Sequence, residues 1–166
     1  SQTTGANPYA PLSERSDGAF YGTPSTGGAY DMGTVFRVTT DGDLTTLVSF
    51  DNTNGANSQT SLTLGEDGAF YGTTSQGGSN NWGTVFRITI NGSLTTLVSF
   101  SSNTQLGFPN TDLISDNRGA FYGAAGKLFR VTTNGTMTAL APNFYASEFG
   151  NLIHTSNNWY YGTTGF

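Results

Sequence analysis

The chain contains one long segment twice. Residues 17–50 read DGAFYGTPSTGGAYDMGTVFRVTTDGDLTTLVSF, and residues 67–100 read DGAFYGTTSQGGSNNWGTVFRITINGSLTTLVSF, so 24 of the 34 positions are identical. A degraded third copy follows at residues 117–140, and NNWYYGTTGF at residues 157–166 begins a fourth. Successive copies lie 50 and 51 residues apart, a period found in solenoids, propellers and arrays of small units. The fold must therefore be built from repeats.

Each copy divides into short runs that predict β-strands. The dipeptides Asp17-Gly18 and Asp41-Gly42 join the runs of the first copy in pairs, and Asp-Gly tolerates the positive φ angles of tight hairpin turns. The runs are rich in Val, Phe, Tyr and Thr, and none keeps apolar residues at helical spacing. The four predicted strands of the first copy span residues 11–16, 19–23, 33–39 and 44–50.

Four antiparallel strands in about 50 residues are typical of one propeller blade. The sequence therefore predicts an all-β fold, a β-propeller-like array with three blades and the inner hairpin of a fourth. The first strand of each unit is expected innermost, because a long polar link follows the fourth strand and carries the chain to the next unit. We expect one repeat domain over residues 1–166, with repeats at about 1–50, 51–100, 101–141 and, in part, 142–166.

Several of these motifs resemble one bacterial repeat family. The chain carries FYGT, a Gly-rich link, GTVFR, an Asp/Asn-Gly turn, LTTLVSF and the stretch GANPYAPL. In this combination it resembles the GloVer tandem repeat of secreted and surface proteins, and the likeness covers nearly the whole chain. The resemblance implies an extracellular or cell-surface protein with a propeller-like array. It brings no catalytic residues to carry over.

Composition excludes some function classes. The net charge is −5 and the sequence pI is about 4.4, so the chain lacks the positive field that a nucleic-acid binder needs. The chain has no cysteine, and a disulfide framework is therefore not expected. No apolar run approaches the roughly 20 residues of a membrane-spanning helix. We expect neither nucleic acid nor a membrane span.

An arginine recurs at one position of the third predicted strand. Arg37, Arg87 and Arg130 are half of the six basic residues. Each could bind an anion or a sugar hydroxyl, or each could pack within its blade and pair with an acid such as Asp17 or Asp67. A buried arginine demands such partners, so the packing interpretation is favoured.

Other recurring or solitary polar residues also favour structural roles. A tyrosine stands in the second strand of every copy, and repetition in each blade is what packing produces. His154 is the only histidine, without the second His or Cys that a metal site would use. The segment Asp51 to Gly55 lacks the alternating acids of a calcium loop. We predict no catalytic residue, metal site or cofactor. The four tyrosines are Tyr21, Tyr71, Tyr122 and Tyr161.

The links between the second and third strands differ most between the two best copies. A constant scaffold with varied loops is a common way to build a binding site. Aromatic rings stack on sugars while amides and carboxylates bond their hydroxyls. The alternative is a solvent-exposed glycine-rich loop with one aromatic ring against the blade edge. The candidate ligand-binding residues are Tyr30, Asp31, Asn80, Asn81 and Trp82.

These features predict a noncatalytic extracellular module for binding or adhesion, with carbohydrate, such as a surface glycan, as ligand. One alternative is a structural subunit that assembles into an oligomer or filament. An enzyme that acts on polysaccharide is the least favoured class. The strand Trp159 to Thr164 has no GTVFR-type partner after it, and an unpaired edge can pair with another chain. We therefore expect a homo-oligomer through this edge, unless the chain is a fragment of a longer repeat protein.

Overall fold

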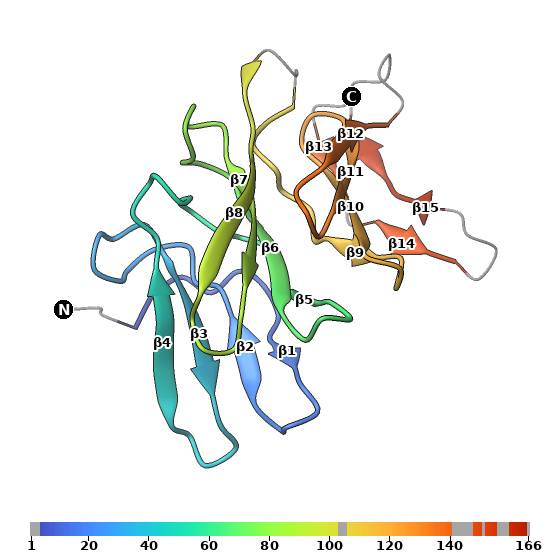
Figure 1. Ribbon diagram of the computed structural model, residues 1–166. Coiled ribbons are helices and arrows are strands. Elements are labelled where there is room, and N and C mark those ends of the chain that lie inside the picture. The colour runs from blue at the N-terminus through green and yellow to red at the C-terminus, as the bar shows by residue number, and fades with distance from the viewer. Residues whose placement is uncertain (1–3, 103–105, 141–147, 151, 156–159, 166) are drawn as a thin grey trace.

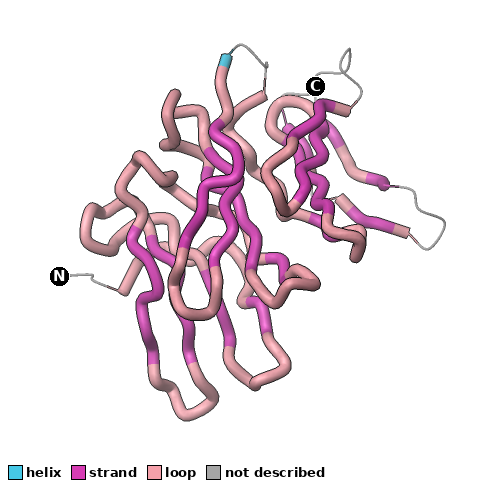
Figure 2. The backbone as a smooth tube through the Cα atoms, viewed as in Figure 1, coloured by secondary structure: helices cyan, strands magenta, loops and turns pink. Residues whose placement is uncertain are grey.

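The chain folds into three four-stranded antiparallel sheets followed by two short strand pairs (Figure 1). The computed structural model describes residues 4–102, 106–140, 148–150, 152–155 and 160–165. Figure 2 shows strands joined by turns and loops, with one short 3₁₀ segment at Ser102, and no α-helix is present in these ranges. The sequence-based prediction of an all-β, propeller-like array of four-stranded blades is confirmed.

Each of the three sheets follows the chain from its first strand to its fourth. The first blade contains β1 (Ser13–Glu14), β2 (Phe20–Gly22), β3 (Thr34–Val38) and β4 (Leu44–Ser49). The second contains β5 (Thr63–Leu64), β6 (Phe70–Thr74), β7 (Thr84–Ile88) and β8 (Leu94–Ser99). The third contains β9 (Ile114–Ser115), β10 (Ala120–Ala124), β11 (Leu128–Thr132) and β12 (Met137–Ala139).

The hairpin turns form where the glycines predict them. Gly42 has a φ of 89° and Gly92 a φ of 83°, values that glycine adopts without the steric cost of a Cβ. The N–H of Gly42 donates to the carbonyl of Thr39 at 3.0 Å, and that of Gly92 donates to Thr89 at 2.9 Å. These local bonds fix the register of the outer hairpins.

The first strands of successive blades lie next to one another (Figure 1). The Ser13 hydroxyl of β1 donates to the carbonyl of Leu62 at the start of the second blade. The Thr63 hydroxyl of β5 donates in the same way to Leu113 of the third blade, at 2.6 Å. The fourth strands lie on the other side of each blade, as predicted from the lengths of the links.

The core lies between blades, and aromatic rings fill it. Tyr21 packs on Phe70 of the next blade with ring centroids 4.4 Å apart, and Tyr71 packs on Phe121 at 4.0 Å. Each blade thus buries its aromatic face only against its neighbour, as in other repeat proteins. The packing role predicted for these two tyrosines is confirmed.

Two short strand pairs follow the third blade. β14 (Ile153–His154) pairs with β15 (Tyr160–Tyr161), and this is the expected inner hairpin of a fourth unit. β13 (Glu148–Phe149) pairs with β16 (Thr164–Gly165), a pairing that the sequence did not predict. Trp159, at the start of the predicted edge strand, and the side chain of His154 lie outside what the structure describes. No helix in the described ranges has the length and apolar character to cross a membrane.

Candidate functional site

The second blade holds a closed group of one acid, one tyrosine and one arginine. The Arg87 guanidinium contacts Asp67 Oδ2 through Nη2 at 2.7 Å and through Nε at 2.8 Å. The Tyr71 hydroxyl donates to the same oxygen at 3.0 Å and accepts from Arg87 Nε at 3.2 Å. Tyr71 and Arg87 stand opposite each other in the register of β6 and β7. Every polar group of this trio therefore has a partner.

The pKa values of the trio follow from these contacts. Partial burial raises the pKa of Asp67, but hydrogen bonds from Arg87, the Ala69 amide and Tyr71 outweigh it and hold the pKa below its usual value. Burial and the bond to Asp67 raise the pKa of Tyr71. The bond to Asp67 raises that of Arg87. Asp67 and Arg87 therefore stay charged, and Tyr71 stays neutral, at neutral pH.

A glycine makes room for this closed trio. A Cβ on Gly65 would lie 2.6 Å from the Tyr71 ring and 2.9 Å from Asp67 Oδ1. Distances below 3 Å between such atoms require one of them to move. Any side chain at position 65 would therefore disturb the arrangement of Asp67 and Tyr71.

The first blade keeps the same three residue types but arranges them differently. Arg15 stands where the second blade has Gly65, since the N–H of each donates to the alanine carbonyl of its own turn. Arg15 Nη1 binds Asp17 Oδ2 at 2.9 Å. Arg37 forms no ion pair or side-chain hydrogen bond with the described residues. The Tyr21 hydroxyl is buried and has no hydrogen-bond partner among them.

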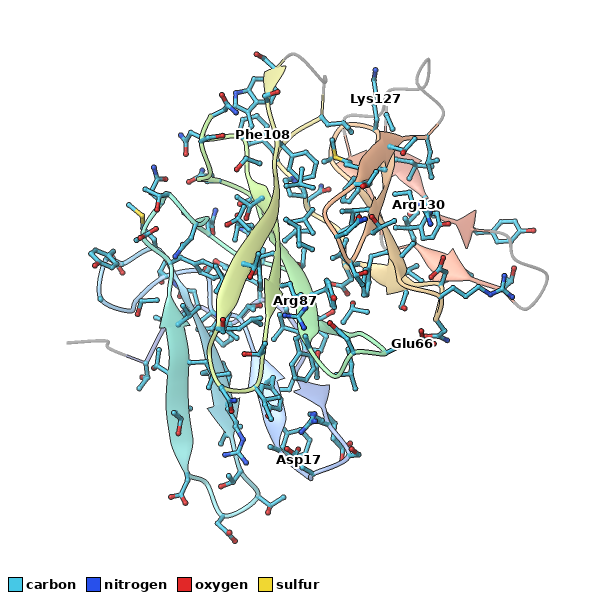
Figure 3. All side chains as sticks on the ribbon, in the orientation of Figure 1. Asp17, Glu66, Arg87, Phe108, Lys127 and Arg130 are labelled. Atoms are coloured by element: carbon cyan, nitrogen blue, oxygen red, sulfur yellow. The ribbon has the colours of Figure 1, made fainter. Side chains whose placement is uncertain are left out.

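A hollow of about 310 Å³ lies at this open group, between the first and second blades. Leu47 of β4 and Ile90 of the second blade form the apolar part of its wall, and Thr45 and Asn91 form a polar part. A second hollow of about 190 Å³ shares Ile90 and is lined by Arg15, Asp67 and Arg87 among others. Figure 3 shows Asp17 at the tip of the β1–β2 hairpin and Arg87 on the neighbouring blade. The larger hollow is lined by Asp17, Tyr21, Arg37, Thr45, Leu47, Ile90 and Asn91.

The charge around these two hollows differs from that of the whole chain. Three of the six basic residues, Arg15, Arg37 and Arg87, line them together with only two acids, Asp17 and Asp67. A backbone hydrogen bond from Ala19, the contact with Arg15 and the charge of Arg37 lower the pKa of Asp17, which therefore stays ionised. The two ion pairs are neutral, so the charge left over in this region is that of Arg37.

The third blade has a third arrangement. Arg118 occupies the turn position of Asp17 and Asp67, and Asp116 occupies that of Arg15. Asp116 Oδ1 accepts from the amides of Arg118 at 2.8 Å and Ala120 at 2.9 Å. Arg130 donates through Nε to the Tyr122 hydroxyl at 3.3 Å. The predicted pairing of the recurrent arginine with the turn acid therefore holds in the second blade, whereas Arg15 takes the acid in the first.

The loop residues predicted to bind ligand are mostly engaged in their own loops. Asp31 Oδ1 accepts from the Gly27 amide at 2.8 Å, and Asn81 Oδ1 accepts from Gly77 at 2.9 Å. Both residues have positive φ angles, 57° and 58°. A hollow of about 300 Å³ adjoins Asp31, and this side of the loop leaves space for a small molecule.

The other predicted loop residues lie in different surroundings. Tyr30 is 61% exposed. Asn80 Nδ2 donates to the Ser79 hydroxyl at 3.1 Å and to the carbonyl of Phe100 at 3.4 Å. Trp82 packs on Phe108 with ring centroids 5.0 Å apart. The five residues come from the corresponding loops of two blades, and whether they bind a ligand stays a prediction.

Sequence reasoning did not find the hollow of the first blade. Its decisive residue, Arg15, lies outside the repeated segment of residues 17–50. The available signal was the difference between Arg15 and Gly65 at equivalent positions, one residue pair among many that differ between the copies. The consequence of that difference depends on side-chain geometry, which a repeat alignment does not contain.

The two tyrosines give a matched test of these arrangements. Tyr71→Phe is expected to lower the free energy of unfolding by about 1–2 kcal/mol, because it removes a hydroxyl that bonds Asp67 and Arg87. Tyr21→Phe is expected to be neutral or slightly stabilising, because its hydroxyl is buried without a partner. Urea unfolding of both variants measures the difference. Equal losses would contradict the different bonding of the two hydroxyls.

Comparison with known proteins gives fold relatives only among solved structures. No family model matches the chain, and no curated protein matches it. The virginiamycin B lyase of Staphylococcus aureus superposes with a TM-score of 0.69 at 16% identity, over 98% of this chain and 50% of that one. A streptogramin B lyase gives 0.60 at 19% identity, over 96% and 54%. A predicted 6-phosphogluconolactonase of Bacteroides uniformis gives 0.57 at 14%, over 96% and 51%.

These neighbours correct the functional prediction. They carry the names of lyases and lactonases, which contradicts the expectation that the chain is no enzyme but a noncatalytic module for binding or adhesion, or a structural subunit. The prediction of a binding module rested on the loops that vary between copies, and loop variation does not distinguish a binding module from an enzyme. At these identities the likeness shows the fold, and this chain spans about half the length of the neighbours.

Proposed function

We propose that the chain forms part of a propeller enzyme that opens a small cyclic ester, with the hollow of the first blade as its substrate site. Two of the structural neighbours are named as lactonases, which supports ring opening of an ester by water, and two are named as lyases of virginiamycin B and streptogramin B. The observation that carries the proposal is Arg37, an arginine without a carboxylate partner beside a buried, unbonded tyrosine hydroxyl. A buried hydroxyl without a partner is costly for folding unless something else binds it.

The chemistry of ester opening matches these groups. When water adds to the carbonyl carbon of a lactone, negative charge develops on the carbonyl oxygen. The ring C–O bond then breaks, the ring oxygen takes one proton of the water to become a hydroxyl, and the other proton is released as the carboxylate forms. Arg37 and the Tyr21 hydroxyl are donors that stabilise such an oxygen. Asp17, which is ionised, accepts a hydrogen bond and orients the attacking water. Its low pKa limits its strength as a base.

Ring opening of a lactone panel by the purified protein tests this proposal. Glucono-δ-lactone and γ-butyrolactone are followed by acid release at constant pH, and streptogramin B by chromatography. Arg37→Gln is expected to reduce kcat/KM by about 100-fold, the usual effect of removing one donor to an oxyanion. Arg87→Gln removes the equivalent arginine outside the larger hollow and serves as the control. No ring opening above the blank, or equal losses in both variants, would overturn the proposal.

We also propose that the fourth hairpin packs against a further blade, from a second copy of the chain or from more of the same protein. Tyr161 is 53% exposed, whereas Tyr21 and Tyr71 are buried by the blade that follows each of them. Homo-oligomerisation through this edge stays a prediction, and sedimentation at micromolar concentration tests it. The GloVer resemblance with its extracellular location, and a surface glycan as a partner, also stay predictions.

A further inference from the structure

The first two blades differ in what neutralises their recurrent arginine. In the second blade, Arg87 shares one carboxylate oxygen of Asp67 with the Tyr71 hydroxyl. In the first blade, no carboxylate oxygen of a described residue lies within 4.0 Å of Arg37. A carboxylate at the place that Asp67 Oδ2 occupies in the second blade would bond both Arg37 and Tyr21. The second blade is thus an internal template for the group that the first blade lacks.

The Tyr21 hydroxyl is a second, independent sign of a missing partner. Tyr21 is only 1% exposed, and its hydroxyl oxygen has no hydrogen-bond partner among the described residues. A buried donor left unsatisfied is unfavourable, and native structures contain few of them. Since Tyr21 lines the same hollow as Arg37, one ligand oxygen can serve both groups.

Arg15 keeps this site open. It holds Asp17 at 2.9 Å and occupies the position where the closed trio requires Gly65. Its guanidinium also extends to the second blade, where Nη2 would lie 3.9 Å from a Cβ on Gly68. With Asp17 bound to Arg15, its carboxylate acts on Arg37 only through its charge and forms no direct contact with it.

We propose that the hollow of the first blade binds the carboxylate of a small hydroxycarboxylic acid, with Arg37 and Tyr21 as its ligands and Arg15 as the residue that keeps it open. Leu47 and Ile90 suit the aliphatic part of such a molecule, and Thr45 and Asn91 suit its hydroxyl. The negative charge of Asp17 disfavours a phosphate dianion relative to a monocarboxylate. A planar carboxylate also matches the fork of an arginine. The inference deepens the proposed function and rests on it, because a hydroxycarboxylate is the product of lactone opening.

Binding of 4-hydroxybutyrate to the purified protein tests this assignment, by NMR shifts of the Tyr21 and Arg37 signals and by calorimetry. We expect saturable binding, with the neutral 4-hydroxybutyramide at least tenfold weaker and phosphate weaker as well. Arg37→Gln should weaken binding at least tenfold. Tyr21→Phe, which leaves the fold intact, should weaken it about five- to tenfold, as for a hydrogen bond to a charged group.

Arg15→Gly gives the sharpest test, because it copies the natural sequence of the second blade. Asp17 should then turn to Arg37 and reduce the affinity about tenfold. Arg87→Gln and Tyr71→Phe are the matched controls and should change the affinity less than twofold. Unchanged binding in Arg15→Gly, equal binding of the amide, or tighter binding of phosphate would each overturn the assignment.

The two proposals fail in different ways. Specific carboxylate binding without turnover of any lactone overturns the proposed enzyme and leaves the binding site. If lactones are turned over, but Arg37→Gln and Arg15→Gly do not change the rate and 4-hydroxybutyrate does not bind, the chain is an enzyme whose site lies elsewhere than in the hollow of the first blade.

Discussion

Replacing Gly83 by alanine is expected to lower the free energy of unfolding by about 2–5 kcal/mol. Gly83 has a φ of 90°, and a Cβ there would lie 2.3 Å from the Thr74 carbonyl oxygen and 2.7 Å from Pro109. The unfavourable φ costs about 1–2 kcal/mol, and the clash with backbone adds about 1–3 kcal/mol. Urea unfolding followed by circular dichroism measures the loss.

Gly42→Ala is the matched control for this variant. Gly42 has a φ of 89° but no atom within 4 Å of the position of a Cβ. Its substitution should therefore cost only the φ term, about 1–2 kcal/mol. Equal losses in the free energy of unfolding of the two variants would show that close packing around Gly83 is not the reason for glycine at this position.

Truncating Phe86 to alanine is expected to cost about 3–5 kcal/mol, the usual range for a fully buried phenylalanine. Phe86 is completely buried, lies over Gly72 of the neighbouring strand and contacts the Phe50 ring of the first blade at a centroid distance of 5.3 Å. Its loss opens a cavity between two blades, so their docking should weaken together with the second sheet. Urea unfolding measures the effect.

Tyr30→Ala serves as the control for Phe86→Ala, since Tyr30 is a large aromatic residue on the surface. Its removal should change the free energy of unfolding by less than about 0.5 kcal/mol. A small loss for Phe86→Ala, comparable to that of Tyr30→Ala, would show that the aromatic contacts between blades contribute little to stability.

The sequence was sufficient for the blade and for the order of its strands. Four antiparallel strands in each unit follow from three signals. These are the 50-residue period, the two Asp/Asn-Gly turns in each of the first two units, and the short runs of Val, Phe, Tyr and Thr. These signals are local, because a hairpin turn and the residues beside it determine which strands pair. The pairing of Arg87 with Asp67 was also within reach, since both residues recur at fixed positions of a predicted hairpin.

Identity between copies was a poor guide to function, for a physical reason. Residues that recur in every blade, such as Tyr71 and Phe86, recur because each blade must pack against the next. In the loops that vary, by contrast, the side-chain oxygens of Asp31 and Asn81 accept hydrogen bonds from backbone amides of their own loops. The prediction of a noncatalytic binding module gave weight to loop variation, and the fold neighbours contradict it.

The sequence repeat determined the four-stranded blades of this protein, and the tertiary structure decided which recurrent arginine has a carboxylate contact. Asp17, Tyr21 and Arg37 match Asp67, Tyr71 and Arg87 in sequence, so the two trios should be alike. The contact of Arg15 with Asp17 makes them different, because Asp17 forms its ion pair with Arg15 and Arg37 is left without a direct carboxylate contact. Which arginine takes the carboxylate depends on distances of a few ångströms between side chains of two strands and the neighbouring blade, and only the folded chain sets those distances.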